Sequence, residues 1–380
     1  MGDVYPTIRL AAVQAAPVFL DREATVELAC RLILEAGANG ADVVGFPEGF
    51  VPAHPVWFHF HPATSPTAME FSKELFANAV VVPSRATDRL AEAAREADTQ
   101  VVIGICEKEP SSMGSMFNSQ LVIGRDGSIV GVRRKLVPTV GERIVHSAGA
   151  GDSVRIFETD VATIGGLMCG ENSNPLLTYA LGALGAKVHV AAWPSFFNRA
   201  ADLQGIADIA CRAIAYQNST FVISSIAGIS PTMEARLPAT DDDREHLRSA
   251  ATRGGTAIYA PGGAVLAGPL PGGDGIAYAD ADFGRIVPRK IVHDYAGDYN
   301  RFDIFQLVVN TSPAAPPIRL GGWLEERQIG QLGGGAAIRL TSPDERRLLV
   351  EPAADSPRDP GPLGAAEPGA AEPGGPPTGA

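Results

Sequence analysis

The stretch that decides the fold runs from Val161 to Ala192 and reads VATIGGLMCGENSNPLLTYALGALGAKVHVAA. Its two ends, 161–168 and 188–192, are nearly continuous apolar runs, which is typical of strands in a sheet that is covered on both faces. Between them, Asn174-Pro175 marks the start of a helix that we predict to run from Pro175 to Gly185. A strand, a helix and a second strand in this order predict a layered α/β fold.

The same alternation extends outward over the rest of the chain. A helix is predicted over Asp21–Asn39, because its apolar residues recur every three or four positions and Asp21 can cap its start. A turn at Asp126-Gly127 predicts a hairpin over Leu121–Val132, so the sheet should be mixed. Further helices are expected around 90–97 and 206–214, and further strands at 8–14, 43–46, 101–105, 221–226, 256–259, 264–267 and 276–280.

Composition excludes several classes of protein. The formal net charge is -12, and no cluster of Lys and Arg is present that could bind a phosphate backbone, so no nucleic-acid partner is expected. No apolar run is long enough to cross a membrane. The cysteines Cys30, Cys106, Cys169 and Cys211 form no CxxC pair, which predicts reduced thiols and a cytoplasmic location.

Glycine and proline are abundant, with 42 Gly and 30 Pro, and they divide the chain unevenly. Residues 353–380 are rich in Pro, Gly and Ala and contain the repeat AAEPG, so we predict a disordered tail there. We therefore predict one catalytic domain over 5–310, a C-terminal extension over 311–352 that could serve as an interface, and the tail.

Reactive side chains follow several predicted strands. Functional residues of α/β folds gather beyond the carboxyl ends of strands. Glu48, Lys135 and Cys169 occupy such positions, and a thiol at a turn into a helix lies where the helix N-terminus favours the thiolate. Cys106 is also at a strand end, and a lone cysteine is most often a buried apolar residue. Lys135, within Arg133-Arg134-Lys135, could equally belong to a solvated surface, so these arguments leave the choice open.

Three motifs carry a resemblance to a known family. They are VVGFPE at 43–48, RKLVPT at 134–139 followed by Glu142-Arg143, and LMCGEN at 167–172. In this order and spacing they resemble the nitrilase branch of the nitrilase superfamily of carbon–nitrogen hydrolases, over about residues 5–310. The resemblance implies a four-layer αββα sandwich with two mixed β-sheets covered by helices. It also implies that the nucleophile is Cys169, while Cys106 falls where nothing catalytic is expected.

The resemblance further implies a function and a set of residues. The expected reaction is hydrolysis of an organic nitrile to the carboxylic acid and ammonia, through a thioimidate and a thioester on the cysteine, with no metal and no organic cofactor. Aliphatic or aryl-aliphatic nitriles are expected, because aromatic residues gather near Trp57. The implied catalytic residues are Glu48, Lys135, Cys169 and Glu142, and the implied substrate-binding residues are Trp57, Gly170, Trp193 and Pro194.

Alternatives and departures accompany this interpretation. An amidase of the same superfamily, a hydratase that stops at the amide, and a non-catalytic scaffold are the competing hypotheses. His54, His59 and His61 form a cluster that could hold a metal, although the spacing does not match a known ligand pattern. The family usually has Trp-Gly at His146-Ser147 and a His at Asp298, so the pocket or an interface should differ there. The resemblance also implies homodimers that assemble into spirals or filaments.

Overall fold

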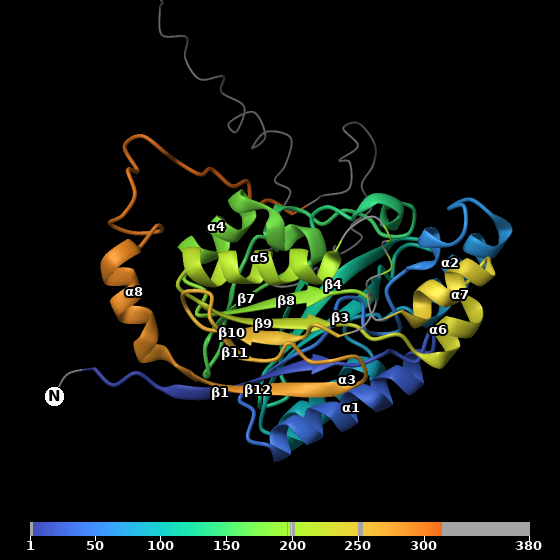
Figure 1. Ribbon diagram of the computed structural model, residues 1–380, viewed down its shortest axis with the longest axis horizontal. Coiled ribbons are helices and arrows are strands. Elements are labelled where there is room, and N and C mark those ends of the chain that lie inside the picture. Colours follow the sequence, from blue (N-terminus) through green and yellow to red (C-terminus); the bar gives the residue numbers. More distant parts are fainter. Residues whose placement is uncertain (1–2, 196, 198, 200–201, 250–253, 314–380) are drawn as a thin grey trace, which may run out of the picture. The chain divides into compact units, whose positions relative to one another are not determined.

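The computed structural model describes residues 3–195, 197, 199, 202–249 and 254–313. Within this part, two six-stranded sheets lie face to face between layers of helices (Figure 1). The strand orders are β12-β1-β2-β3-β4-β5 and β11-β10-β9-β8-β7-β6. The strands are β1 (Thr7–Gln14), β2 (Val43–Gly45), β3 (Gln100–Lys108), β4 (Met116–Ile123), β5 (Ile129–Arg134), β6 (Phe157–Glu158), β7 (Thr163–Met168), β8 (Val188–Trp193), β9 (Phe221–Ile226), β10 (Ala257–Tyr259), β11 (Val265–Ala267) and β12 (Gly275–Asp282).

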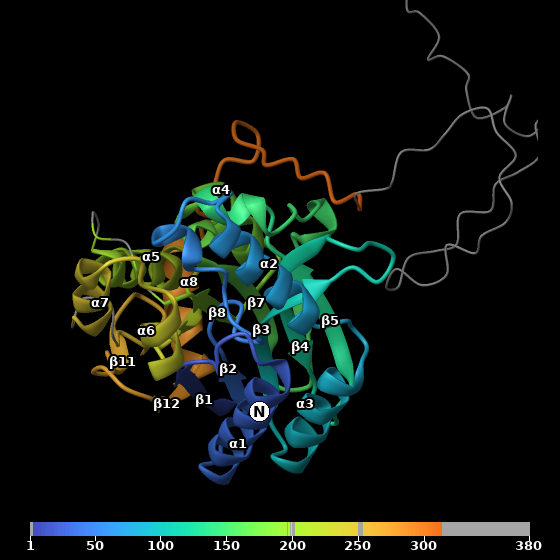
Figure 2. The same ribbon diagram turned by 90° about the vertical axis from the view of Figure 1, so that its right-hand side faces the viewer.

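Helices cover the outer faces of both sheets. In Figures 1 and 2, α1 and α3 cover the first sheet, and α4 and α5 cover the second. The α-helices are α1 (Arg22–Ala38), α2 (Pro66–Asn78), α3 (Arg85–Glu96), α4 (Pro175–Ala183), α5 (Leu203–Gln217), α6 (Pro231–Arg236), α7 (Asp241–Arg248) and α8 (Ile286–His293). The short 3₁₀ helices are η1 (Trp57–His59), η2 (Val140–Ile144), η3 (Gly151–Ser153), η4 (Cys169–Ser173) and η6 (Phe283–Arg285).

The alternation of side chains along β1 shows how the layers are built. Leu10 and Ala12 lie in the core between the two sheets, together with Val190 and Ile223 of the second sheet. Ala11 and its alternate neighbours face α1 and α3 instead. Both faces of the strand are thus buried, which explains its continuous apolar sequence. The predicted αββα sandwich with two mixed sheets is confirmed.

Most of the predicted elements are present. Asp21 caps α1, where its side chain accepts a hydrogen bond from Ala24 N at 3.0 Å. The β4–β5 hairpin is also present, but β4 begins at Met116 rather than Leu121. Likewise, β3 continues to Lys108, three residues beyond the predicted strand at 101–105. The strand ends were missed because polar side chains interrupt the apolar pattern. In the fold these side chains find partners: Ser119 Oγ on β4, for example, donates to Glu107 Oε2 on β3 at 2.6 Å.

Other expectations concern the ends of the chain and membranes. Helices α2, α6, α7 and α8 were not predicted. The tail at 353–380 and nearly all of the extension at 311–352 lie outside the described residues. Among the described helices, none has both the length and the apolar character that a membrane span requires.

Candidate active site

An ammonium group buried between two carboxylates forms the centre of the site. Lys135 follows β5 directly, and its Nζ lies 2.7 Å from Glu48 Oε1 and 2.8 Å from Glu142 Oε2. All three side chains are at most 1% exposed. Asn118, on β4, donates from Nδ2 to Glu48 at 2.6 Å and to Glu142 at 2.8 Å. Three of the predicted catalytic residues therefore meet in one buried network.

The turn that carries Glu48 is fixed by close backbone contacts. It follows β2, and Glu48 N donates to Trp193 O of the second sheet at 3.2 Å. Gly104 of the neighbouring β3 has no room for a side chain, because a Cβ would lie 2.2 Å from Pro47 O. Pro47 and Gly104 thus hold the glutamate in place from two sides.

The two glutamates have different surroundings, which separates their acidities. Glu142 lies in η2 and accepts hydrogen bonds from Thr139 N and from Lys135 and Asn118. His146 Nδ1 lies 3.2 Å from Glu142 Oε1. Burial alone would raise the pKa of Glu142, but the hydrogen bond from His146 and the nearby positive charges hold it well below its ordinary value.

Glu48 has fewer donors than Glu142. Among the described residues, Glu48 Oε2 has no hydrogen-bond partner. Burial raises the pKa of Glu48 to about 7, although the Lys135 ammonium acts in the opposite direction and the charge of Glu142 adds to the rise. The pKa of Lys135 is raised, since the charges of Glu48 and Glu142 outweigh the effect of burial. At neutral pH, Glu48 is thus the member of the pair that can exchange a proton.

Cys169 stands on a strained turn directly after β7. Its φ is +48°, a left-handed conformation that costs a non-glycine residue roughly 1–3 kcal/mol. Burial and, after it, the charge of Glu48 raise the pKa of the Cys169 thiol to about 12. The Gly170 N–H at the start of η4 lowers this pKa, which is the direction that the sequence suggested, but burial and the carboxylate of Glu48 outweigh it. The thiol needs a base to become nucleophilic.

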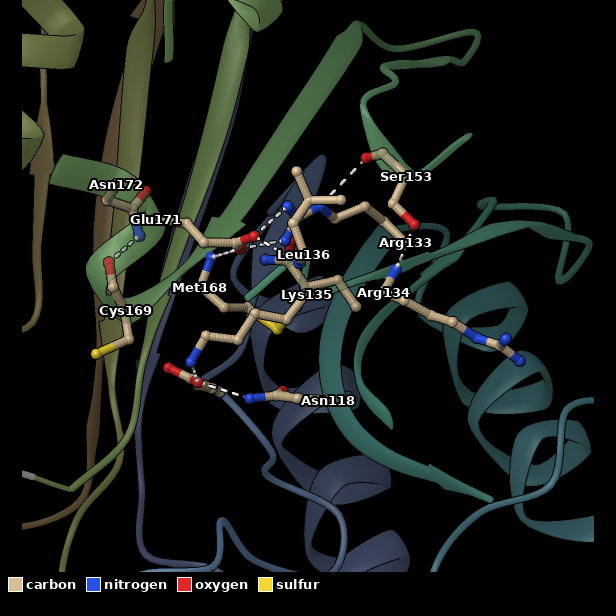
Figure 3. A network of polar contacts seen from close by, with 12 residues as sticks. Asn118, Arg133, Arg134, Lys135, Leu136, Ser153, Met168, Cys169, Glu171 and Asn172 are labelled. Carbon is tan, nitrogen blue, oxygen red and sulfur yellow. Dashed lines mark hydrogen bonds and ion pairs between the residues drawn. The ribbon is translucent and has the colours of Figure 1, made fainter. Parts of the chain in front are cut away.

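The thiol and the ammonium belong to one site. The charges of Lys135 and Glu48 both act on the pKa of Cys169, and the Gly170 N–H lowers that pKa. In Figure 3 the Cys169 thiol and the end of the Lys135 side chain lie on the same side of the network. Glu48, Lys135, Glu142 and Cys169 thus act on one another electrostatically, and their catalytic roles stay a prediction.

Three of the predicted substrate-binding residues lie close to Cys169, and the fourth, Trp57, lies in the apolar core. Trp193 ends β8 and packs in the same apolar cluster as Cys169, and half-buried Pro194 follows it. Gly170 is exposed beside the thiol. Trp57 is only 1% exposed, and its ring stacks on Phe71 with centroids 5.5 Å apart. The direct role of Trp57 in substrate binding stays a prediction, and its observed contacts are those of a core residue.

The histidines near Trp57 have separate partners. His61 Nε2 lies 2.9 Å from Leu237 O, and the ring of His59 packs on Phe58. His54 Nδ1 lies 3.7 Å from Glu48 Oε1. Glu48, His54 and Glu142 could offer ligand atoms within 4.8 Å of one another to a metal ion. A cation there would face the Lys135 ammonium, so the arrangement suits proton transfer better than metal binding.

Sequence reasoning missed several residues of the site. Asn118 bridges both glutamates, and the signal for it was a polar residue within an apolar strand. Arg133 was considered as part of a solvated surface, but it is 1% exposed and paired with Glu171. Cys106 lies within β3, buried, and its Sγ donates to Ala53 O at 3.3 Å. Burial raises the pKa of that thiol well above its ordinary value, and the assignment of Cys169 as the nucleophile stays a prediction.

Comparison with known proteins gives a consistent result. Residues 9–290 match the carbon–nitrogen hydrolase family. The chain is 35% identical over 332 residues to Nitrilase 2 of an unknown prokaryotic organism, covering 86% of this chain and 100% of that protein. It is 33% identical over 314 residues to an aliphatic nitrilase of Rhodococcus rhodochrous, covering 81% of each.

A solved structure shows the same architecture. The NitFhit protein of C. elegans superimposes with a TM-score of 0.62 at 17% identity, covering 80% of this chain and 67% of that one. At this level of identity, the likeness concerns the fold.

Proposed function

The chain belongs to the carbon–nitrogen hydrolase family, and on that premise we propose that it is a nitrilase, which hydrolyses an organic nitrile to the carboxylic acid and ammonia. One observation carries the proposal. The Lys135 ammonium is held between two buried carboxylates beside the thiol of Cys169, and one of these carboxylates can exchange a proton near neutral pH.

The first step forms a covalent bond to the nitrile carbon. Glu48 takes the proton of the Cys169 thiol, and the sulfur attacks the carbon while one bond of the C≡N triple bond moves its electrons to nitrogen. The Lys135 ammonium stabilises the negative charge that develops on that nitrogen. Glu48 returns the proton to the nitrogen, which gives a thioimidate and restores the carboxylate, and we assign the Gly170 N–H as a donor to the reacting group.

Two molecules of water complete the reaction. Glu48 activates the first water, which adds to the thioimidate, and ammonia leaves to give a thioester. The second water attacks the thioester, releases the carboxylic acid and returns the proton to the sulfur. Glu142, held as an anion, keeps Lys135 charged and in place throughout. Together the steps convert one nitrile and two waters into one acid and one ammonia.

The substrate class and cellular setting form the second part of the proposal. Apolar and aromatic side chains close to the site suit an aliphatic or aryl-aliphatic nitrile. The match to an aliphatic nitrilase of Rhodococcus rhodochrous supports this choice. We also propose a cytoplasmic enzyme that forms homodimers and larger assemblies, as the resemblance in the sequence implies.

The test is a panel of aliphatic, aryl-aliphatic and aromatic nitriles, with ammonia, acid and amide measured together. We expect ammonia and acid in equal amounts from the wild type and no turnover by Cys169→Ala, because alanine has no sulfur to attack the nitrile carbon. Cys30→Ala is the matched control, since that thiol is half-buried like Cys169 but lies on α1, which covers the other sheet. Ammonia release by Cys169→Ala at the wild-type rate would refute the mechanism.

The product ratio separates the alternatives. Amide as the main product, with little ammonia, would indicate a hydratase. Hydrolysis of amides but not of nitriles would indicate an amidase of the same family. A Cys169 thiol no more reactive toward iodoacetamide than Cys30, with no turnover of either substrate, would indicate a scaffold.

A further inference from the structure

A buried ion pair joins the two segments that carry Lys135 and Cys169. Arg133 lies on β5 two residues before the lysine, and Glu171 lies in η4 two residues after the cysteine. The guanidinium donates through Nη1 to Glu171 Oε2 and through Nη2 to Glu171 Oε1, the latter at 2.6 Å. The two side chains are only 1% and 5% exposed.

The same carboxylate also contacts the backbone beside each catalytic residue. Leu136 N donates to Glu171 Oε1 at 2.8 Å, and Met168 N donates to Glu171 Oε2 at 3.1 Å. Leu136 directly follows Lys135, and Met168 directly precedes the nucleophile. As Figure 3 shows, one side chain thus connects the lysine segment to the cysteine segment.

The other side of the Cys169 turn is held as well. Asn172 Nδ2 donates to Cys169 O at 3.1 Å, and Asn172 Oδ1 lies 2.9 Å from His189 Nε2 on β8. Burial lowers the pKa of His189 to about 3, so its ring is neutral and can donate from one nitrogen only. A left-handed conformation at Cys169 persists only where the surroundings fix it, and Asn172 and Glu171 provide two such anchors.

We propose that Arg133 and Glu171 are a positioning pair, which holds the turn of Cys169 against the end of β5 so that the thiol faces the ammonium. The inference rests on the proposed function, because it concerns the same site. Neither side chain is placed at the reacting atoms, so the pair acts through the backbone. A buried ion pair is weak evidence for stability, whereas its planar, two-pronged contact fixes geometry.

Glu171→Gln is the decisive variant. It keeps the shape of the side chain, but the NH2 group of glutamine is a hydrogen-bond donor. This group would face the N–H groups of Arg133 or Met168, which donate to the carboxylate in the wild type. Glu74→Gln is the matched control, because Glu74 forms a two-pronged pair with Arg236 at 2.9 and 2.6 Å on the surface between α2 and α6. Unfolding temperature, kcat and KM are measured for each variant. The rate of Cys169 alkylation by iodoacetamide is followed by peptide mass spectrometry from about pH 6 to about pH 11, a range of about 2.5 units on either side of an ordinary thiol pKa of about 8.5.

A positioning role predicts a specific pattern of results. In Glu171→Gln, we expect kcat to fall by about 100-fold with a much smaller change in KM, and the pH profile of alkylation to shift. Glu74→Gln should stay within about twofold of the wild type. A folded Glu171→Gln enzyme with a lower unfolding temperature, but with wild-type kcat and alkylation profile, would overturn the proposal and leave a purely structural pair.

A second variant decides the matter if Glu171→Gln does not fold. Arg133→Lys keeps the positive charge but cannot make the two-pronged contact with Glu171. This variant should therefore fold, and iodoacetamide should alkylate its Cys169 about tenfold more slowly than in the wild type. An unchanged alkylation profile in Arg133→Lys would overturn the proposal. Alkylation needs no nitrile, so these results stand even if the wild type releases no ammonia, which would refute the proposed function alone.

Discussion

At the scale of single residues, the environment decides what each side chain can do. Glu48 and Glu142 are chemically identical and contact the same ammonium, yet their pKa values move in opposite directions. His146 and Thr139 N give Glu142 donors that Glu48 lacks. The different donors around the two carboxylates therefore give them different acidities.

The pH dependence of activity follows from the pKa of Glu48. This pKa is raised to about 7, so Glu48 is protonated and unable to act as a base at lower pH. We expect kcat/KM of the proposed nitrilase reaction to fall about tenfold for each pH unit below about 6, and to level off above about 7.5. Initial rates at low substrate in a series of buffers measure this. A profile that stays flat down to about pH 5 would contradict the assignment of Glu48 as the base.

At the scale of elements, strands and the turns after them place the reactive groups. Glu48, Lys135 and Cys169 all lie beyond strand ends, and this much was evident from the apolar runs that precede them. The contacts between neighbouring strands were not evident. Gly104 of β3 fits against the turn of Glu48, and no pattern within β3 itself indicates that a side chain would be excluded there.

Substitution of Gly104 tests this contact between elements. A Cβ in Gly104→Ala would lie 2.2 Å from Pro47 O and 2.6 Å from Gly49 N, both of them backbone atoms that cannot rotate away. We expect the free energy of unfolding to fall by about 3 kcal/mol and kcat to fall as the turn moves.

Gly114→Ala is the control for this substitution, because a Cβ there meets no atom within 4 Å. Chemical denaturation and steady-state kinetics on both variants give the comparison. Equal stability of the two variants would show that the turn of Glu48 adapts at little cost.

At the scale of the whole molecule, apolar side chains are exposed on α4 and α5, the two helices that cover the second sheet. Leu176 on α4 is 64% exposed, and Ile209 on α5 is 69% exposed. Both helices lie on the outer face of the second sheet (Figure 1). Exposed apolar groups on neighbouring helices are typical of surfaces that bind another protein. This face therefore agrees with the homo-oligomer that we propose.

A charged residue on this face should weaken self-association. In Ile209→Asp, an acidic side chain would have to be buried in any contact made by α5, in a chain that already carries a net charge of -12. We expect light scattering to give a lower mass for this variant than for the wild type. Met113→Asp, at a loop residue that is 99% exposed, is the control. A monomeric wild type, or equal masses for all three proteins, would contradict the prediction.

The sequence by itself determined the class of fold, the order of most strands and helices, and the four candidate catalytic residues. Local patterns suffice for this, because periodicity, turn residues and motifs are properties of neighbours along the chain. The tertiary structure decided the partners and the protonation states. Glu48 and Lys135 are 87 residues apart in the chain, and Arg133 and Glu171 are 38 apart. Burial and charge act on a pKa through space, so only the folded arrangement makes the pKa values of Glu48 and Glu142 differ and keeps Cys169 a thiol at rest. The fold also buries Arg133, which the sequence allowed to be a surface residue, against Glu171 beside the site.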